Sequence, residues 1–391
     1  MTAIKSMPTC KFAREDALAL AGDLVSGIRK RAERCMVERI VPEETIRELK
    51  DSGLVRLMQP KRYGGYELGR DVVCEVIQRF APVCGSQAWV YHVYADHAWM
   101  LGTFSRKVQD DVWGDDKDTL ISSSFAPLAR AHPTKGGFVC SGRHGFSSGI
   151  DHAHWVVCGG IVEGSGEVIH FLVPKHEGTV IDDWDVNGLE GTGSKSFHIK
   201  EVFVPEHRTM KFSLALAGKG LGTEFNTAPL YKAPRYGYTS AGFTALVTGM
   251  AQGLLDDWLA FTARRGGPKG VARKESMQML AGQSASEITT AETLYLTTAR
   301  VATRRLDGGE DLAAGGNHQI RCNFAFAVQL VLAATVRLYH ASGASMVYRG
   351  NSMERQYRNI MAGVQHMSTD WPSGAAGYGA HLLRQHGADL P

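Results

Sequence analysis

The sequence lacks the features that would place the chain in a membrane or on nucleic acid. No apolar run reaches the ~18 residues that a membrane-spanning helix needs, and the first five residues, Met1 to Lys5, do not open a signal peptide. The net charge of +3 is too small to indicate a basic nucleic-acid surface. We therefore expect a cytoplasmic protein without nucleic-acid or membrane partners.

Cysteine is also scarce, and two cofactor-binding motifs are missing. The seven cysteines are scattered and include no C-x-x-C pair, which is typical of reduced thiols rather than of a disulfide framework. The chain has no G-x-G-x-x-G after a strand and no P-loop. A Rossmann-type flavin site is therefore not supported, and a nicotinamide site is not expected.

The 391 residues are 44% hydrophobic and 21% charged, as in an ordinary soluble globular protein of two or three domains at ~150 residues each. Apolar residues recur every three to four positions in the first and last parts of the chain, which predicts helices there. The expected helices cover 17–35, 43–52, 71–81, 84–104, a short segment after Ser105, 238–262, 273–305, 319–340 and 352–365. The glycine-rich end of the chain, 367–391, is predicted to be an irregular tail.

The middle of the chain has a different pattern. Short β-branched and aromatic runs alternate with Gly, Pro and Asp, which predicts a compact antiparallel sandwich or barrel. The expected strands cover 120–125, 137–141, 155–161, 168–173 and 196–204. The fold class is thus α+β, with an N-terminal helical domain (1–118), a central β-domain (119–215) and a C-terminal four-helix bundle with its tail (216–391).

The segment 142–155 is the most polar connection in this β-region. It contains the adjacent hydroxyls Ser147 and Ser148, the histidines His144, His152 and His154, and three glycines. Glycine allows the backbone to approach a ligand closely, and a loop held between strands can carry functional groups. The alternative is a long hairpin loop in which glycine serves only turn geometry.

The order of helices, β-domain and bundle, together with several motifs, resembles the acyl-CoA dehydrogenase fold. The motifs are Pro60-Lys61-Arg62-Tyr63-Gly64-Gly65, the segment from Trp184 to Glu206, Phe261-Thr262-Ala263-Arg264-Arg265-Gly266, and Ser342-Gly343-Ala344. Within that fold the chain is more similar to the oxygenase components of two-component flavin monooxygenases. That similarity rests on Gly142-Arg143-His144-Gly145-Phe146-Ser147-Ser148-Gly149, Phe125-Ala126-Pro127, Trp89, His97-Ala98-Trp99 and His366, although His144 replaces the usual Trp.

The resemblance implies a reaction and a cofactor. Reduced flavin (FMN or FAD, supplied by a separate flavin reductase) and O2 would form a C4a-hydroperoxyflavin that hydroxylates an aromatic, phenolic small molecule. The family also forms homotetramers through the bundle, which implies the same here. The choice between FMN and FAD stays open, because Arg264 and Arg265 would serve a phosphate in both.

The resemblance also implies roles for individual residues. His366 would bind or protonate the peroxide, His97 would act on the phenol, and Ser147 or Ser148 would line the flavin ring; these four are the expected catalytic residues. The further flavin-binding residues are Phe125, Thr192, Ser194, Arg264, Arg265, Ser342 and Gly343, and those at the substrate are Trp89, His92 and Phe146 as well as His97.

Structural readings of the same residues stay open. His366 could simply end a helix, Trp89 and Trp99 could be core aromatics, and one of the two arginines could be solvated. His152 and His154 have metal-ligand spacing, but no third ligand is evident nearby, so we expect no metal site.

Two alternative functions also remain. The same fold can oxidise nitrogen or sulfur, which the sequence cannot separate from carbon hydroxylation. An acyl-CoA dehydrogenase needs a carboxylate base, but 357–391 contains no Glu and only Asp370 and Asp389 as acids, with His366 where a base would stand.

Overall fold

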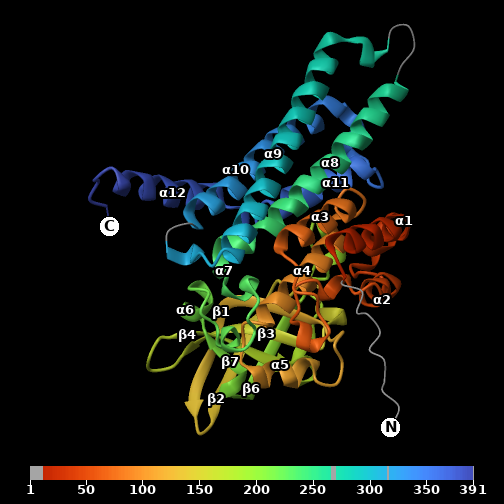
Figure 1. Cartoon of the computed structure of the whole chain (residues 1–391). Coiled ribbons are helices and arrows are strands. Elements are labelled where there is room, and N and C mark those ends of the chain that lie inside the picture. The colour runs from red at the N-terminus through yellow and green to blue at the C-terminus, as the bar shows by residue number, and fades with distance from the viewer. Residues whose placement is uncertain (1–11, 266–269, 315–316, 391) are drawn as a thin grey trace, which may run out of the picture.

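The computed structural model describes residues 12–265, 270–314 and 317–390. Met1 to Lys5, Gly266 of the arginine motif and Gly315 and Gly316 of the loop after the second bundle helix lie outside the described residues. Figure 1 shows three regions in chain order: N-terminal helices, a β-sheet and a bundle of long helices that extends away from the sheet. This order confirms the predicted acyl-CoA dehydrogenase-like α+β fold, whereas the boundaries near 118 and 215 stay a prediction.

The first region consists of five helices, as predicted. They are α1 Arg14–Glu38, α2 Glu43–Asp51, α3 Arg70–Phe80, α4 Gly85–Leu101 and α5 Arg106–Trp113. Pro42 precedes α2, and Glu43 and Glu44 occupy its first turn, where the positive end of the helix dipole favours anions. Every residue of α4 is buried, so this helix lies in the centre of the fold.

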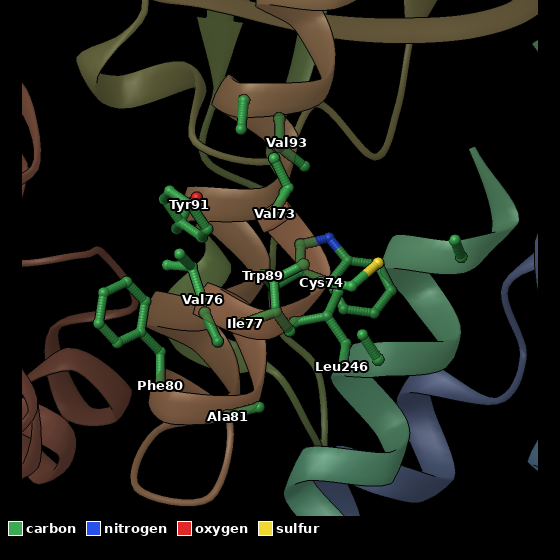
Figure 2. Close-up of a cluster of buried hydrophobic side chains, with 14 of the residues drawn as sticks. Val73, Cys74, Val76, Ile77, Phe80, Ala81, Trp89, Tyr91, Val93 and Leu246 are labelled. Atoms are coloured by element: carbon green, nitrogen blue, oxygen red, sulfur yellow. The ribbon is translucent and has the colours of Figure 1, made fainter. Parts of the chain in front are cut away.

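The packing around α4 joins the N-terminal helices to the bundle. Val73, Cys74 and Ile77 of α3 lie in one apolar cluster with Trp89 of α4 and Leu246 of α8, as Figure 2 shows. A buried ion pair accompanies this cluster: the Arg70 guanidinium lies 2.5 Å from the Asp96 carboxylate. Aromatic rings from both regions pack on this ion pair: Arg70 stacks on Trp99 of α4 and on Tyr238 at the start of the bundle.

The central region is one seven-stranded sheet with strand order β5-β6-β2-β1-β3-β4-β7. The strands are β1 Ile121–Thr134, β2 Gly137–His144, β3 Trp155–Val162, β4 Val168–Pro174, β5 Thr179–Ile181, β6 Ser196–Pro205 and β7 Thr209–Lys211. Every pairing is antiparallel except that of β1 with β3, which is parallel. Side chains of β1, β2, β3, β4 and β6 share one apolar core, so the sheet curves around it.

Three features of the sheet differ from the prediction, the first being the parallel pairing of β1 with β3 in a region predicted to be antiparallel. β1 continues nine residues past Phe125 to Thr134, because bulges on both sides of Pro127 absorb a residue that cannot donate to the ladder. β5 and β7 were not predicted, since three-residue edge strands are too short to show alternation.

The last region contains α6 Phe212–Leu216, α7 Arg235–Tyr238, α8 Ser240–Arg264, α9 Glu275–Asp307, α10 Asn317–Ser342, α11 Ser352–Gly363 and α12 Trp371–Gln385. The helices α8 to α11 are the four predicted for the bundle. Among the described residues only α10 is long and apolar enough to cross a membrane by length and composition, and it packs against α8 and α9.

The prediction of an irregular tail after Met367 was wrong, because α12 occupies most of it. The Asp370 carboxylate caps this helix by accepting a hydrogen bond from the Ser373 amide at 3.0 Å, and Pro372 stands in the first turn. A Cβ at Gly374 would lie 3.2 Å from the Ala325 side chain, so glycine here allows α12 to approach α10 closely. Tertiary contact therefore overrides the low helix propensity of glycine.

His144, which stands where the resembling enzymes have Trp, gives a testable stability effect. It is fully buried on β2, and neither ring nitrogen has a hydrogen-bond partner among the described residues. Burial lowers the pKa of His144 to about 4, whereas a histidine in the unfolded chain titrates near 6.5. Between these values the unfolded chain binds more protons, so this group makes the fold less stable as the pH falls from 6.5 to 4.

We expect His144→Phe to raise the free energy of unfolding by about 1–3 kcal/mol at pH 7, since it removes an unpaired buried polar group. The gain should grow as the pH falls to 4. Urea denaturation at several pH values measures both effects, and the same substitution at the exposed His176 is the control. An unchanged pH slope in the His144 variant would contradict the assignment.

Candidate active site

A row of buried hydroxyl groups lies against α4. The Trp89 indole N–H donates to Ser148 Oγ at 3.2 Å, and 2.7 Å separates Ser148 Oγ from Ser194 Oγ and Ser194 Oγ from Thr192 Oγ1. The Thr192 hydroxyl donates to the Leu189 carbonyl at 2.8 Å. Because a hydroxyl has one proton, this last bond sets the direction of the whole row: each hydroxyl donates toward Leu189. Ser148 Oγ can therefore only accept a further hydrogen bond.

The loop that carries Ser148 is held by two hydrogen bonds from other elements. The Ser122 hydroxyl donates to the Ser148 carbonyl at 2.9 Å, and the Tyr94 hydroxyl donates to the Gly149 carbonyl at 2.6 Å. Gly149 has φ +70°, and a Cβ there would lie 2.6 Å from the Tyr94 hydroxyl. Glycine is thus required both by the backbone and by the space, and the loop places Ser148 rigidly.

The two adjacent serines differ in their hydrogen bonds. Ser148 belongs to the hydroxyl row, whereas the buried Ser147 hydroxyl has no partner among the described residues. Phe146, expected at the substrate, is 78% exposed and contacts the Trp184 ring at 5.7 Å between centroids. Because the hydroxyl row is buried, this exposed side chain is not part of it, and its φ of +62° marks a left-handed turn of the loop.

His366 lies on the other side of Trp89. Its ring stacks on Phe243 of α8 at 3.7 Å and meets the Trp89 ring edge-on at 5.8 Å. Burial lowers the pKa of His366 to about 4, so the ring is neutral near pH 7. Its Nδ1 accepts from the Ser368 amide at 3.2 Å, which places the single proton on Nε2. His366 is therefore a neutral hydrogen-bond donor.

His97 forms a second polar group with β1. Its Nδ1 lies 2.7 Å from the Ile121 carbonyl, which can only accept, so Nδ1 carries the proton. Its Nε2, 2.8 Å from Ser123 Oγ, must then accept the serine proton. Burial lowers the pKa of His97 to about 4. The Ser123 oxygen keeps lone pairs that can accept a proton from another hydroxyl.

Phe125, expected at the flavin, lies beside this second group. Its ring meets that of His97 at 5.7 Å, and the Arg235 guanidinium lies 3.7 Å above the Phe125 ring. Arg235 is 6% exposed, and among the described residues no carboxylate lies within ion-pair distance of it. Burial lowers the pKa of Arg235 to about 10, so it remains a cation near pH 7. It also lines a small cleft with Trp99 and Thr103.

His92 is the least satisfied residue near these groups. Its ring is fully buried and meets Phe243 edge-on at 4.6 Å, and neither nitrogen has a partner among the described residues. Burial lowers the pKa of His92 to about 3, which keeps it neutral. The aromatic ring of Phe243 thus lies between His92 and His366.

Four of the expected flavin-binding residues lie elsewhere in the chain's fold. Arg264 and Arg265 stand at the C-terminal end of α8, and Ser342 and Gly343 stand at the C-terminal end of α10. The 25 residues of α8 span about 37 Å at 1.5 Å per residue, and Figure 1 shows that the helix runs away from the sheet. One chain does not bring these residues to Ser148.

The remaining candidates have structural partners. His152 contacts the Val41 carbonyl at 2.7 Å and Glu43 at 3.1 Å, and His154 accepts from the Leu120 amide. Within the described ranges, no group of three His, Cys, Asp or Glu side chains could hold a metal ion. The exposed Asp370, the acid that a dehydrogenase reading requires, serves as the cap of α12.

Sequence reasoning missed three residues that the structure brings into the site: Ser123, Arg235 and Phe243. Ser123 follows Ile121 and Ser122 in the sequence, and nothing in this pattern distinguishes it as a site residue. Phe243 reads as one more apolar position of a helix. Arg235 after Pro234 offered the only signal, a cation just before a long apolar helix.

Comparison with known proteins adds family information. The family described as Acyl-CoA dehydrogenase, N-terminal domain, matches residues 24–113, and the family described as Acyl-CoA dehydrogenase, C-terminal domain, matches residues 241–371. The chain is 31% identical over 354 residues to the flavin-dependent monooxygenase oxygenase subunit HsaA of Rhodococcus jostii, which covers 89% of this chain and 93% of that protein.

Two further relatives agree. The oxygenase component of p-hydroxyphenylacetate 3-hydroxylase from Acinetobacter baumannii is 29% identical over 91% of this chain and 86% of its own length. The crystal structure of 3-HSA hydroxylase from Rhodococcus sp. RHA1 superposes with a TM-score of 0.90 at 30% identity, covering 96% of this chain and 98% of that one.

Proposed function

The chain belongs to the flavin-dependent monooxygenase oxygenase components that share the acyl-CoA dehydrogenase fold, and we propose that it hydroxylates a phenolic small molecule at the site formed by Ser148, His366 and His97. The single observation that supports this site is the pair of contacts that Trp89 makes. Its indole donates to Ser148 on one side and meets the His366 ring on the other, so one side chain joins the hydroxyl row to the neutral histidine.

The donor and acceptor set fits a reduced flavin. Reduced flavin, when bound, supplies the reaction with O2 that makes one oxygen atom transferable to the substrate. Its N5 carries a hydrogen, whereas N5 of oxidised flavin only accepts. Ser148 Oγ has only acceptor capacity left, because its proton goes to Ser194. A hydroxyl that can only accept a hydrogen bond suits the N5–H group of reduced flavin and not the N5 acceptor of oxidised flavin. Ser148 therefore favours the reduced cofactor.

In this proposal His366 donates to negative charge that develops on oxygen. A neutral Nε2–H donor stabilises such charge without bringing a positive charge into a buried site. The half-buried ring is fixed by stacking on Phe243 and by the Ser368 amide, so its donor direction is set before the cofactor binds.

In this proposal His97 and Ser123 polarise the phenol. A phenol of pKa about 10 would lose its proton to a histidine of pKa about 4 only at a cost of about 8 kcal/mol. Ser123 therefore accepts a hydrogen bond from the phenol and passes its own proton partly toward His97, which raises the electron density of the ring. The buried Arg235 cation favours the negative charge that develops on the phenol oxygen.

The first test uses the reaction of the reduced enzyme with oxygen. We expect rapid mixing of protein and anaerobically reduced flavin with oxygenated buffer to give an absorbing species distinct from reduced and oxidised flavin. His366→Ala should shorten its lifetime at least tenfold and release more hydrogen peroxide, because the donor is lost.

His318→Ala is the matched control, since His318 of α10 stacks on His381 outside the site. Return of the wild-type mixture to oxidised flavin at the rate seen without protein would contradict the monooxygenase site.

The second test separates the phenol from the oxygen reaction. We expect Ser123→Ala to lower the yield of hydroxylated product per flavin about tenfold while leaving the lifetime of the oxygen-derived species unchanged, because Ser123 hydrogen-bonds to His97, which we assign to the phenol. Ser124→Ala on the same strand is the control, and product analysis with stopped-flow absorbance measures both quantities. An equal loss in both variants would count against the Ser123–His97 relay.

The family's oxygenase components receive reduced flavin from a partner reductase, and we propose that the same holds here, with the protein acting in the cytoplasm. We further propose a homotetramer in which Arg264 or Arg265, with Ser342 and Gly343, reaches the flavin phosphate of a neighbouring copy. Support comes from their separation from Ser148 within one chain and from exposed apolar side chains on the bundle, among them Leu259, Met279 and Phe326.

Mixed oligomers test this sharing of the site. A Ser148→Tyr variant blocks one half of the site, and an Arg264→Ala/Arg265→Ala variant removes the other half. If the arginines act on a neighbouring copy, co-refolded mixtures should recover about a quarter of wild-type activity although each variant alone is inactive. Mixtures as inactive as the separate variants would contradict the shared site.

A further inference from the structure

The turn at which the hydroxyl row ends is held from the bundle. Asn359 of α11 is buried, and its side-chain oxygen accepts a hydrogen bond from the Leu189 amide at 2.7 Å. A backbone amide can only donate, so the oxygen and not the nitrogen of the Asn359 side chain faces Leu189. A Cβ at Gly188 would lie 2.4 Å from the Arg358 carbonyl oxygen, so the backbones of helix and turn are in direct contact.

Leu189 has a backbone conformation that needs such support. Its φ of +57° and ψ of +31° are left-handed, which a residue with a side chain rarely adopts unless its surroundings hold it there. Its carbonyl accepts from the Thr192 hydroxyl at 2.8 Å and from the Trp184 indole at 3.3 Å. The direction of that carbonyl depends on the backbone of Leu189, whose amide Asn359 holds. The contact at the amide therefore fixes the acceptor at which the hydroxyl row ends.

We propose that Asn359 is a positioning residue that sets the preference of the site for reduced over oxidised flavin, an inference that rests on the proposed function. Asn359 holds Leu189, and the Leu189 carbonyl takes the Thr192 proton. This direction leaves Ser148 only as an acceptor. Without the Asn359 oxygen the left-handed turn relaxes, and Thr192 is free to donate back along the row. Ser148 can then donate to the N5 acceptor of oxidised flavin, so the preference for the reduced form falls.

The same helix offers a matched control. Gln356, three residues before Asn359, is also buried, and its side-chain nitrogen donates to the Pro82 carbonyl at 2.8 Å. This bond holds α11 against the segment between α3 and α4 and not against the turn of Leu189. Each of the two side chains thus ties α11 to another part of the chain, but only that of Asn359 leads to the hydroxyl row. Loss of either bond loosens the helix, whereas only one of them changes the row.

The test measures anaerobic dissociation constants of oxidised and reduced flavin, with FMN or FAD according to which the wild-type protein binds more tightly. We expect Asn359→Leu to lower the ratio of the oxidised to the reduced constant about fivefold, the effect of one neutral hydrogen bond. Asn359→Asp keeps an oxygen that accepts from Leu189 and should retain the wild-type ratio. Gln356→Leu should retain it as well.

A second arm asks whether Asn359 acts through the hydroxyl row. Thr192→Val removes the hydroxyl that donates to the Leu189 carbonyl and should lower the same ratio. Adding Asn359→Leu to Thr192→Val should then change the ratio little further, because both substitutions act on one bond. A purely structural role of Asn359 would weaken the binding of both flavin forms equally and leave the ratio unchanged.

An unchanged ratio in Asn359→Leu would overturn the inference, as would an equal loss in Gln356→Leu or in Asn359→Asp. Asn359→Ala also lacks the acceptor and takes the place of Asn359→Leu if that variant does not fold. Wild-type protein that binds oxidised flavin as tightly as reduced flavin would contradict the proposed function itself. A wild-type preference for reduced flavin that Asn359→Leu retains would overturn only the role of Asn359.

Discussion

The complete burial of α4 is the constraint on which the rest of the structure depends. Polar side chains on a buried helix are stabilised by partners from other elements, since an unpaired buried polar group, such as His92 here, costs about 1–3 kcal/mol. Trp89 hydrogen-bonds to Ser148 in a β-domain loop, and His97 hydrogen-bonds to the Ile121 carbonyl and to Ser123 on β1. These bonds fix the loop and the strand against the helix, and so the same bonds build the site.

The ion pair of Arg70 and Asp96 extends this constraint to the bundle. Its two charges would be expensive to bury alone, but they lie 2.5 Å apart and Arg70 stacks on Tyr238, 4.4 Å from the ring centroid. Tyr238 stands just before α8, which carries Phe243 and thereby positions His366. The histidine after α11 is thus located relative to α4 through two elements that are far apart in the sequence.

Burial also decides the chemistry of the histidines. His97 and His366 are neutral near pH 7 because burial disfavours the cation, and one backbone contact each then determines which ring nitrogen carries the proton. The same physical effect produces an acceptor at His97 and a donor at His366. The proposed hydroxylation uses both, the acceptor for the phenol and the donor for oxygen.

The sequence by itself determined the order of helices, sheet and bundle, because periodicity of 3.6 or 2 residues is a local property of α1, α8 or β3. The resemblance, carried by the segment 142–149 and by the residues around His97 and His366, also supplied the reaction class and indicated Ser147 or Ser148 together with His97 and His366. Only the tertiary structure decided which serine joins the hydroxyl row, that Ser123 and Arg235 belong beside His97, and that α12 is helical. It also set Arg264, at the far end of α8, away from the sheet that carries Ser148. Contacts between residues distant in the chain leave no periodic trace in the sequence, because they depend on how buried surfaces and polar groups are matched between elements.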